Sequence, residues 1–177
     1  MFLTVIVYVV ASSLARPVVR TFDPSPPRAP LPASDSVVTD TVTVDATAAD
    51  VWRFLDLDRR VVLAIPDTAG WDLAFRRHSL ITSGGVLDLG AVAYDSVIRA
   101  PSGPYTATIA GRDTANAVLQ RWYRYRLLTH LLEPNAHVYA IRTREGRYAK
   151  LEILSYYCPG PLAGCPTVRY TIPLESP

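Results

Sequence analysis

Apolar and polar side chains alternate most regularly near the C-terminus of the chain. Two runs rich in β-branched and aromatic residues, 138–143 and 147–157, flank Arg144-Glu145-Gly146. This pattern is typical of a β-hairpin with a short loop. The sequence therefore predicts an antiparallel pair of strands over residues 138–157.

The length of this loop follows from which side chains face each other. A two-residue loop would place apolar residues opposite charged ones. A three-residue loop gives four cross-strand pairs that separate into an apolar and a polar face: Tyr139 with Leu151, Ile141 with Ala149, Ala140 with Lys150, and Arg142 with Tyr148. Because register decides which face is buried, we expect the three-residue loop, with Gly146 in the left-handed conformation.

A second turn follows, with a cysteine at each end. Residues 158–165 read CPGPLAGC and precede a β-rich run over 167–172. If Cys158 lies opposite Cys165, three apolar-face pairs follow: Ser155 with Val168, Ile153 with Tyr170, and Leu151 with Ile172. We expect one three-stranded antiparallel meander, and a disulfide between the only two cysteines, which is typical of an oxidising compartment.

Shorter alternating runs fill the rest of the chain. The sequence predicts a half-exposed strand over 37–44, a helical turn leading into a strand over 46–57, and further strands over 60–65, 70–77 and 79–81. In the run 70–77, Trp71, Leu73 and Phe75 alternate on the side expected to be buried. Asp72 lies between them, and we expect its carboxylate to tie a neighbouring turn.

Glycine and proline mark the remaining breaks. Ser83-Gly84-Gly85 indicates a turn, Gly90 a β-bulge in the apolar run 86–98, and Asp113 or Thr114 the cap of one helical turn over 113–120. These elements sum to eight to eleven short strands with one or two brief helices. The predicted fold class is all-β or mainly β, with antiparallel meander sheets.

The first 36 residues form two segments ahead of the predicted domain. Residues 2–11 are apolar apart from Thr4, too short a run to span a bilayer, and small residues at Ser13 and Ala15 indicate signal-peptide cleavage after Ala15. Residues 16–36 carry six prolines, which favours an extended tether. We expect a signal peptide over 1–15, a tether over 16–36 and one β domain over 37–177, in a secreted or periplasmic protein with no membrane span after processing.

Composition limits the functions that this chain can have. The 177 residues carry a formal charge of +2, too small and too evenly spread to indicate a nucleic-acid partner. No GxSxG, HExxH, CxxC or phosphate-binding glycine loop occurs, so we expect no catalytic activity and no metal site of the usual kinds. Ten tyrosines and three tryptophans could line a site for a flat apolar ligand, which needs little sequence signature.

Four blocks of this sequence together resemble the HmuY-like family of exported bacterial proteins. They are residues 71–85 (WDLAFRR followed by SGG), 122–125 (WYRY), 138–158 and 165–170 (CPTVRY), within a resemblance covering about 42–172. The family implies a mostly β fold whose loops grip haem, so the resemblance implies haem or another porphyrin as cofactor and partner. A receptor in the outer membrane would be a further partner.

The resemblance also implies which residues bind the iron. The best-studied member uses two histidines, and His130 lies where we expect the later one, judged by its distance from the following hairpin. The earlier ligand should fall within 91–105, which contains neither histidine nor methionine. Tyr94 or Tyr105 could serve there as a phenolate, or His137 could assist His130. This chain also lacks the lipid-attachment cysteine of that member.

Two functions are therefore expected. The first is an exported, non-catalytic haem-binding protein resembling a haemophore. The alternative is a cell-surface or periplasmic β domain that recognises a protein or glycan without haem. A second ligand or an apolar slot beside His130 would favour the first, whereas burial of His130 in a polar network with no adjacent cleft would favour the alternative.

Overall fold

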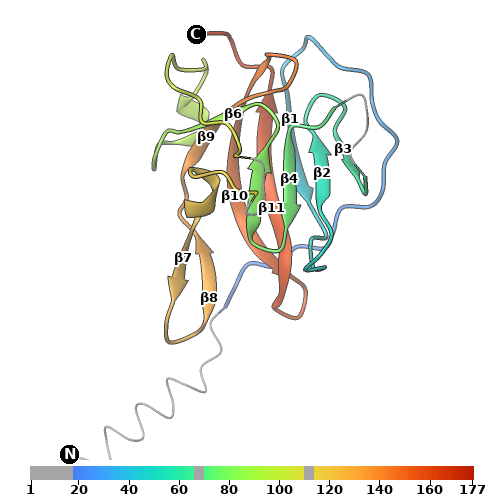
Figure 1. Cartoon of the computed structure of the whole chain (residues 1–177), viewed down its shortest axis with the longest axis vertical. Helices are drawn as coiled ribbons and strands as arrows, with labels where there is room; N and C mark the ends of the chain where they lie inside the picture. The colour runs from blue at the N-terminus through green and yellow to red at the C-terminus, as the bar shows by residue number, and fades with distance from the viewer. Residues whose placement is uncertain (1–17, 66–69, 110–113) are drawn as a thin grey trace, which may run out of the picture.

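The chain folds as a mainly antiparallel β protein (Figure 1). The computed structural model describes residues 18–65, 70–109 and 114–177. Within these residues the strands are β1 (Val38–Thr43), β2 (Arg53–Asp56), β3 (Val61–Leu63), β4 (Leu73–Arg76), β5 (Ser79–Thr82), β6 (Gly85–Asp88), β7 (Tyr123–Arg126), β8 (Leu131–Pro134), β9 (Val138–Arg142), β10 (Tyr148–Cys158) and β11 (Leu162–Ile172). Two 3₁₀ turns, η1 (Tyr94–Ser96) and η2 (Leu119–Arg121), complete this part of the chain, and the predicted fold class is confirmed.

A five-stranded sheet in the order β1-β11-β10-β9-β6 contains the predicted meander. The β9–β10 hairpin has the expected register, with Tyr139 opposite Leu151 and Ile141 opposite Ala149. The Thr143 amide donates to the Arg147 carbonyl at 2.8 Å, which closes the three-residue loop. Gly146 has a φ of +84°, as the loop length required.

The predicted register of the β10–β11 pair is wrong by two residues. Leu151 lies opposite Tyr170 and Ile153 opposite Val168. The strands turn earlier than the cysteines suggest, with Cys158 opposite Leu162, and two irregularities before Ser155 and Tyr157 absorb the difference. A shift of two residues keeps every side chain on its face, so the apolar face survives the error. The Cys158–Cys165 disulfide is present, with Cα atoms 5.0 Å apart.

A four-stranded sheet in the order β3-β2-β4-β5 packs its apolar side chains into the same core. Leu55, Leu73 and Phe75 are buried there against Leu151 and Val168 of the larger sheet. The helical turn predicted before β2 is absent, because the Asp45 carboxylate accepts hydrogen bonds from the Thr47 amide and hydroxyl in a bend instead. The helical turn predicted over 113–120 appears as η2. At its start, the Val118 and Leu119 amides donate to Asn116 Oδ1. Asp113 lies outside the described residues.

The outer face of the β9–β10 hairpin is covered rather than solvated. Ala140 is 0% and Lys150 6% exposed, although the sequence pattern marks this face as polar. The segment after β6, which includes η1, lies over it, and Lys150 Nζ donates to the Tyr94 carbonyl at 2.9 Å. Residues 86–98 are therefore a strand followed by a covering loop, in which Tyr94 is buried.

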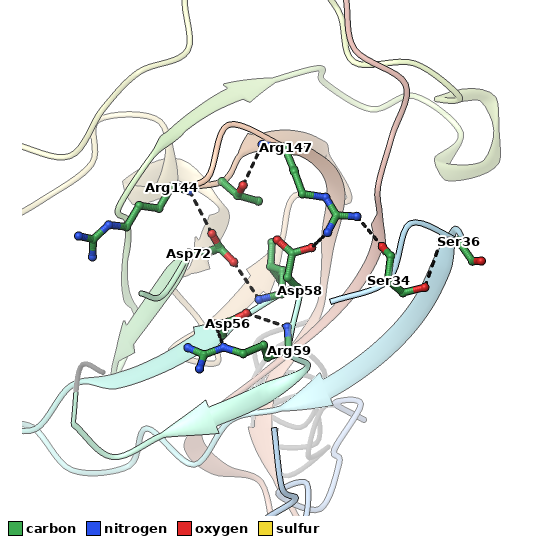
Figure 2. A network of polar contacts seen from close by, with 10 residues as sticks. Ser34, Ser36, Asp56, Asp58, Arg59, Asp72, Arg144 and Arg147 are labelled. Carbon is green, nitrogen blue, oxygen red and sulfur yellow. Dashed lines mark hydrogen bonds and ion pairs between the residues drawn. The ribbon is translucent and has the colours of Figure 1, made fainter. Parts of the chain in front are cut away.

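Asp72 joins two turns at one end of the molecule (Figure 2). Its Oδ2 accepts from the Leu57 amide at 2.9 Å, and its Oδ1 accepts from the Arg144 amide of the β9–β10 loop at 3.2 Å. The predicted tie to a neighbouring turn is confirmed. Close by, Arg147 pairs with Asp58 at 2.5 Å and donates to the Ser34 carbonyl.

The proline-rich segment lies on the folded body instead of extending away from it. The Phe22 amide donates to the Tyr157 carbonyl at 3.1 Å, and the Leu31 amide donates to the Arg59 carbonyl at 3.0 Å. Arg28 forms a 2.7 Å ion pair with Asp40 of β1. Over residues 18–36, the part of the predicted tether that the structure describes, these contacts fix the segment along the two sheets. The predicted signal peptide lies outside the described residues.

No helix in the described ranges has the length and apolar character needed to cross a membrane.

Candidate functional site

The β7–β8 hairpin projects from the two packed sheets (Figure 1). Its strands pair with each other, Tyr123 opposite Pro134 and Arg126 opposite Leu131, and among the described strands they join neither larger sheet. Residues 127–130 form the turn at its tip. The hairpin carries His130, the first candidate iron ligand, away from the core.

Buried contacts fix the base of this hairpin. The indole of Trp122, 1% exposed, donates from Nε1 to the His78 carbonyl at 2.9 Å. The Asn135 amide donates to the Trp122 carbonyl at 2.9 Å, and the Leu132 amide donates to the Tyr157 hydroxyl at 2.8 Å. The tip is therefore exposed while its root is anchored in the core.

His130 is exposed at the tip, in a left-handed backbone conformation with φ of +55°. Its Nδ1 shares a short hydrogen bond with the Tyr125 hydroxyl of the facing strand, and the two ring centroids are 5.9 Å apart. Among the described residues, Nε2 has no hydrogen-bond partner. If Nδ1 donates its proton to Tyr125, Nε2 holds the free lone pair that a metal ligand needs.

The turn that carries this imidazole also carries exposed apolar side chains. Leu127 is 77% exposed, Leu128 99% and Tyr125 48%. A hollow of about 520 Å³ is lined by Tyr125, Arg126, Leu127, Leu128, Thr129 and Glu133. Exposed apolar side chains gathered at one point commonly mark a binding surface. One imidazole beside an apolar hollow is a donor set that suits a flat apolar ligand carrying a metal.

His137, the second histidine candidate, is held elsewhere. It lies just before β9, half-buried, and its Nδ1 is 3.0 Å from both carboxylate oxygens of Asp88 at the end of β6. Since β6 and β9 are neighbouring strands, this pair links the edge of the five-stranded sheet. His137 does not share the hollow at the hairpin tip.

Tyr94 is packed too tightly to serve as a ligand. It is 6% exposed, and its hydroxyl is bonded to the Thr171 hydroxyl at 2.7 Å. The Arg169 guanidinium lies 3.8 Å and the Lys150 ammonium 4.3 Å from its ring centroid. Burial raises the pKa of its phenol to about 12, which disfavours the phenolate that iron would need.

Tyr105 is also engaged within the protein. Its hydroxyl donates to the Pro101 carbonyl at 3.1 Å, and its ring packs on Tyr148 with centroids 5.5 Å apart. Burial raises its pKa to about 12 as well. The segment with Tyr94 lies at the opposite end of the molecule from the β7–β8 tip (Figure 1). The four predicted ligands are therefore dispersed, and His130 alone of them is exposed in the β7–β8 turn, next to the residues that line the hollow.

Sequence reasoning missed the residues that accompany His130. Tyr125, Leu127 and Leu128 have no motif of their own, but the run YRYRLLTH combines alternation with two apolar residues at a turn. A turn usually holds polar residues, so this departure could have marked the tip. Within the described residues, no group of three or more histidine, cysteine or acidic side chains could hold a metal ion.

No family model matches the chain, and neither does any curated protein. Among solved structures, a lipoprotein from Bacteroides fragilis is 22% identical over 77% of this chain and 90% of its own, with a TM-score of 0.67. A Bacteroides vulgatus protein named as an HmuY-like haem-binding protein is 21% identical over 77% and 93%, with a TM-score of 0.64. The apo HmuY analogue of Tannerella forsythia is 16% identical over 77% and 96%, with a TM-score of 0.66.

These likenesses agree with the resemblance seen in the sequence. The matched structures are covered almost completely, so the whole domain is shared rather than one motif. None of these three is named as an enzyme. The chain has the fold of the HmuY-like proteins.

Proposed function

We propose that this chain is an exported, non-catalytic haem-binding protein that holds the porphyrin at the tip of the β7–β8 hairpin. The observation that carries the proposal is the exposed imidazole of His130, fixed at Nδ1 by Tyr125, in a turn that also exposes Leu127 and Leu128. The fold supports it, because a protein with that fold is named as haem-binding. Export is supported by the likeness to a lipoprotein and by the disulfide.

Each part of the hollow has a role in this proposal. His130 Nε2 would be the axial ligand, and bound haem would supply the iron that accepts its lone pair. Leu127 and Leu128 would cover part of the apolar porphyrin face and lose solvent exposure on binding. Tyr125 would hold the imidazole in the tautomer that leaves Nε2 free.

A titration with haemin, followed by visible absorption, tests this function. The wild-type chain should give a saturable Soret shift, and His130→Ala should lose it. His78→Ala is the matched control, since His78 is exposed in another turn and its ring contacts Tyr123. His137→Ala should bind as the wild type does, because Asp88 already holds that ring.

Two results would contradict the proposal at different levels. A Soret shift that survives in His130→Ala would keep haem binding and remove His130 as the ligand. No saturable shift with either ferric or ferrous haem would favour the alternative, a surface β domain that recognises a protein or glycan. The exposed side chains at the hairpin tip would then be that domain's contact surface.

A further inference from the structure

A narrow cleft lies where the edges of the two large sheets meet, far along the chain from the β7–β8 hairpin. Its walls come from β1, at the edge of the five-stranded sheet, from β2 and β3 of the smaller sheet, and from residues 24–28 of the docked segment. We call it the seam cleft, and it encloses about 130 Å³. Figure 1 shows the docked segment passing outside these strands.

The walls of the seam cleft are fixed by hydrogen bonds. The Ser25 amide donates to the Thr43 carbonyl and the Thr43 amide donates to Ser25 Oγ, each at 2.9 Å. The Arg28–Asp40 ion pair ties the same segment to β1 a little further along the chain. These contacts fix the docked segment against β1, so two walls of the cleft are held in place relative to each other.

Positive charge is in excess along the cleft. Arg28, Arg53 and Arg60 line it with Asp45, and since Asp40 neutralises Arg28, two arginines remain against one carboxylate. In the part of the chain that the structure describes, the Arg60 guanidinium has no hydrogen-bond or ion-pair partner. Arg53 makes one hydrogen bond there, from Nε to the Asp45 carbonyl at 3.3 Å, which leaves its terminal nitrogens available.

The one carboxylate in the cleft is already engaged. Asp45 Oδ1 accepts from the Thr47 hydroxyl at 2.6 Å and from the Thr47 amide at 3.1 Å. The Thr47 hydroxyl holds the pKa of Asp45 below its usual value, so this group stays ionised. Thr47 uses only Oδ1, and within the described residues no arginine of the cleft donates to this carboxylate, so Arg53 and Arg60 keep hydrogen-bond donors to satisfy.

A buried hydroxyl near the cleft also lacks a partner. Tyr170 of β11 is 0% exposed, and among the described residues its hydroxyl makes no hydrogen bond. Burial raises the pKa of this phenol and the charge of Asp40 raises it further, whereas the positive charges of Arg28 and Arg60 act to lower it. A buried hydroxyl without a partner is unusual in a purely structural cluster.

The remaining wall of the cleft is apolar. Three prolines, Pro24, Pro26 and Pro27, face Val42 and Val62 across it. A phosphate or sulfate ion would leave this surface uncovered, whereas a carboxylate with a short hydrocarbon body would cover it. Guanidinium groups bind carboxylates with paired hydrogen bonds. We propose that the seam cleft binds a small carboxylate of about four carbons, with Arg60 and Arg53 as the groups that bind its oxygens.

Butyrate is the probe that tests this proposal. Titration calorimetry at constant ionic strength should give a dissociation constant on the order of 1 mM, as expected for a ligand of few atoms. Arg60→Gln should raise that constant roughly tenfold or more, since a charge-assisted hydrogen bond is lost. Arg124→Gln is the matched control, because Arg124 is exposed on the distant β7 and should leave butyrate binding unchanged.

Further arms separate the possible explanations. If Arg60→Gln fails to fold, Arg53→Gln provides the second variant and should weaken binding in the same direction. Equal affinity for inorganic phosphate and butyrate would contradict the proposal that the ligand is a carboxylate. The site itself would be overturned if no saturable heat appeared up to 50 mM butyrate, which is roughly fifty times the expected dissociation constant. The haemin titration of His130→Ala is independent of each outcome, because the two sites share no residue.

Discussion

Single residues in this protein have their roles decided by their neighbours more than by their type. Tyr94 and Tyr125 are both tyrosines near a basic side chain in the sequence. Tyr94 is buried under Arg169 and Lys150, whereas Tyr125 stands exposed and bonded to His130. Only the second arrangement leaves a nitrogen lone pair near an open apolar hollow, and so His130 is the residue on which haem binding is argued.

Asp72 gives a prediction about pH. Burial raises the pKa of this carboxyl to about 7, although the Leu57 and Arg144 amides act to lower it. The native state then holds a proton between pH 3.8 and about 7 that the unfolded chain releases. The contribution of Asp72 to the free energy of unfolding is therefore fully present at acid pH and falls as pH rises to 7, by about 1.4 kcal/mol per pH unit.

Urea unfolding at pH values from 4 to 8 checks this slope. Asp72→Asn should show a flatter dependence than the wild type, because the variant has no proton to lose. Its stability at pH 5 should also be lower, since an amide nitrogen cannot accept from a backbone amide. The nearby charged groups Asp56, Asp58, Glu145, Arg59, Arg144 and Arg147 are present in both proteins. Asp50→Asn, at an exposed position, is the control, and an unchanged slope in Asp72→Asn would contradict the assignment.

At the scale of elements, the sequence predicts strand pairing well where the length of a short loop and the separation of apolar from polar faces require the same register. The β9–β10 register follows from both, and the structure confirms it. The β10–β11 register was argued from the cysteines, which proved a poor guide because a disulfide does not require its residues to be directly opposite. The irregularities in β10 lie near its end, where Ser155, Tyr156, Tyr157 and Cys158 are all buried, so no alternation of apolar and polar residues is left there to show the extra residue of a bulge.

The β10–β11 disulfide gives a second stability prediction. Cys158→Ala combined with Cys165→Ala opens a loop with a sequence separation of seven. In the chain-entropy estimate, this should lower the free energy of unfolding by about 2.5 kcal/mol. Thermal unfolding of the double variant, beside the wild type with and without reductant, measures the loss. If the double variant unfolds at the same midpoint as the oxidised wild type, the predicted stabilisation by loop closure is contradicted. A lower midpoint of the reduced wild type would then have another cause than the loss of loop closure.

Across the whole molecule, the sequence anticipates the folded body better than the binding surfaces. Long alternating runs predict most of the sheets because burial of one face sets their period. The docking of residues 18–36 and the covering of the β9–β10 face by the segment with η1 depend on contacts between distant parts of the chain, which no local pattern encodes. The two candidate sites also depend on contacts between distant segments. The seam cleft is lined by four segments, and the hollow at the end of the β7–β8 hairpin is exposed because this hairpin projects from the core.

This division between body and hairpin leads to the last prediction. Leu127 and Leu128 are 77% and 99% exposed on a hairpin whose strands, within the described chain, pair with no other strand. Replacing both with serine removes no core contact, so the thermal midpoint should stay within about 2 °C of the wild type. Haemin affinity should fall by roughly tenfold or more, because the porphyrin loses the apolar surface that covers it. Leu119→Ala, a buried core change at η2, is the opposite control and should lower the midpoint by several degrees. If the serine variant lost stability and kept its affinity for haemin, the tip would be part of the folded core and the haem site would have to lie elsewhere.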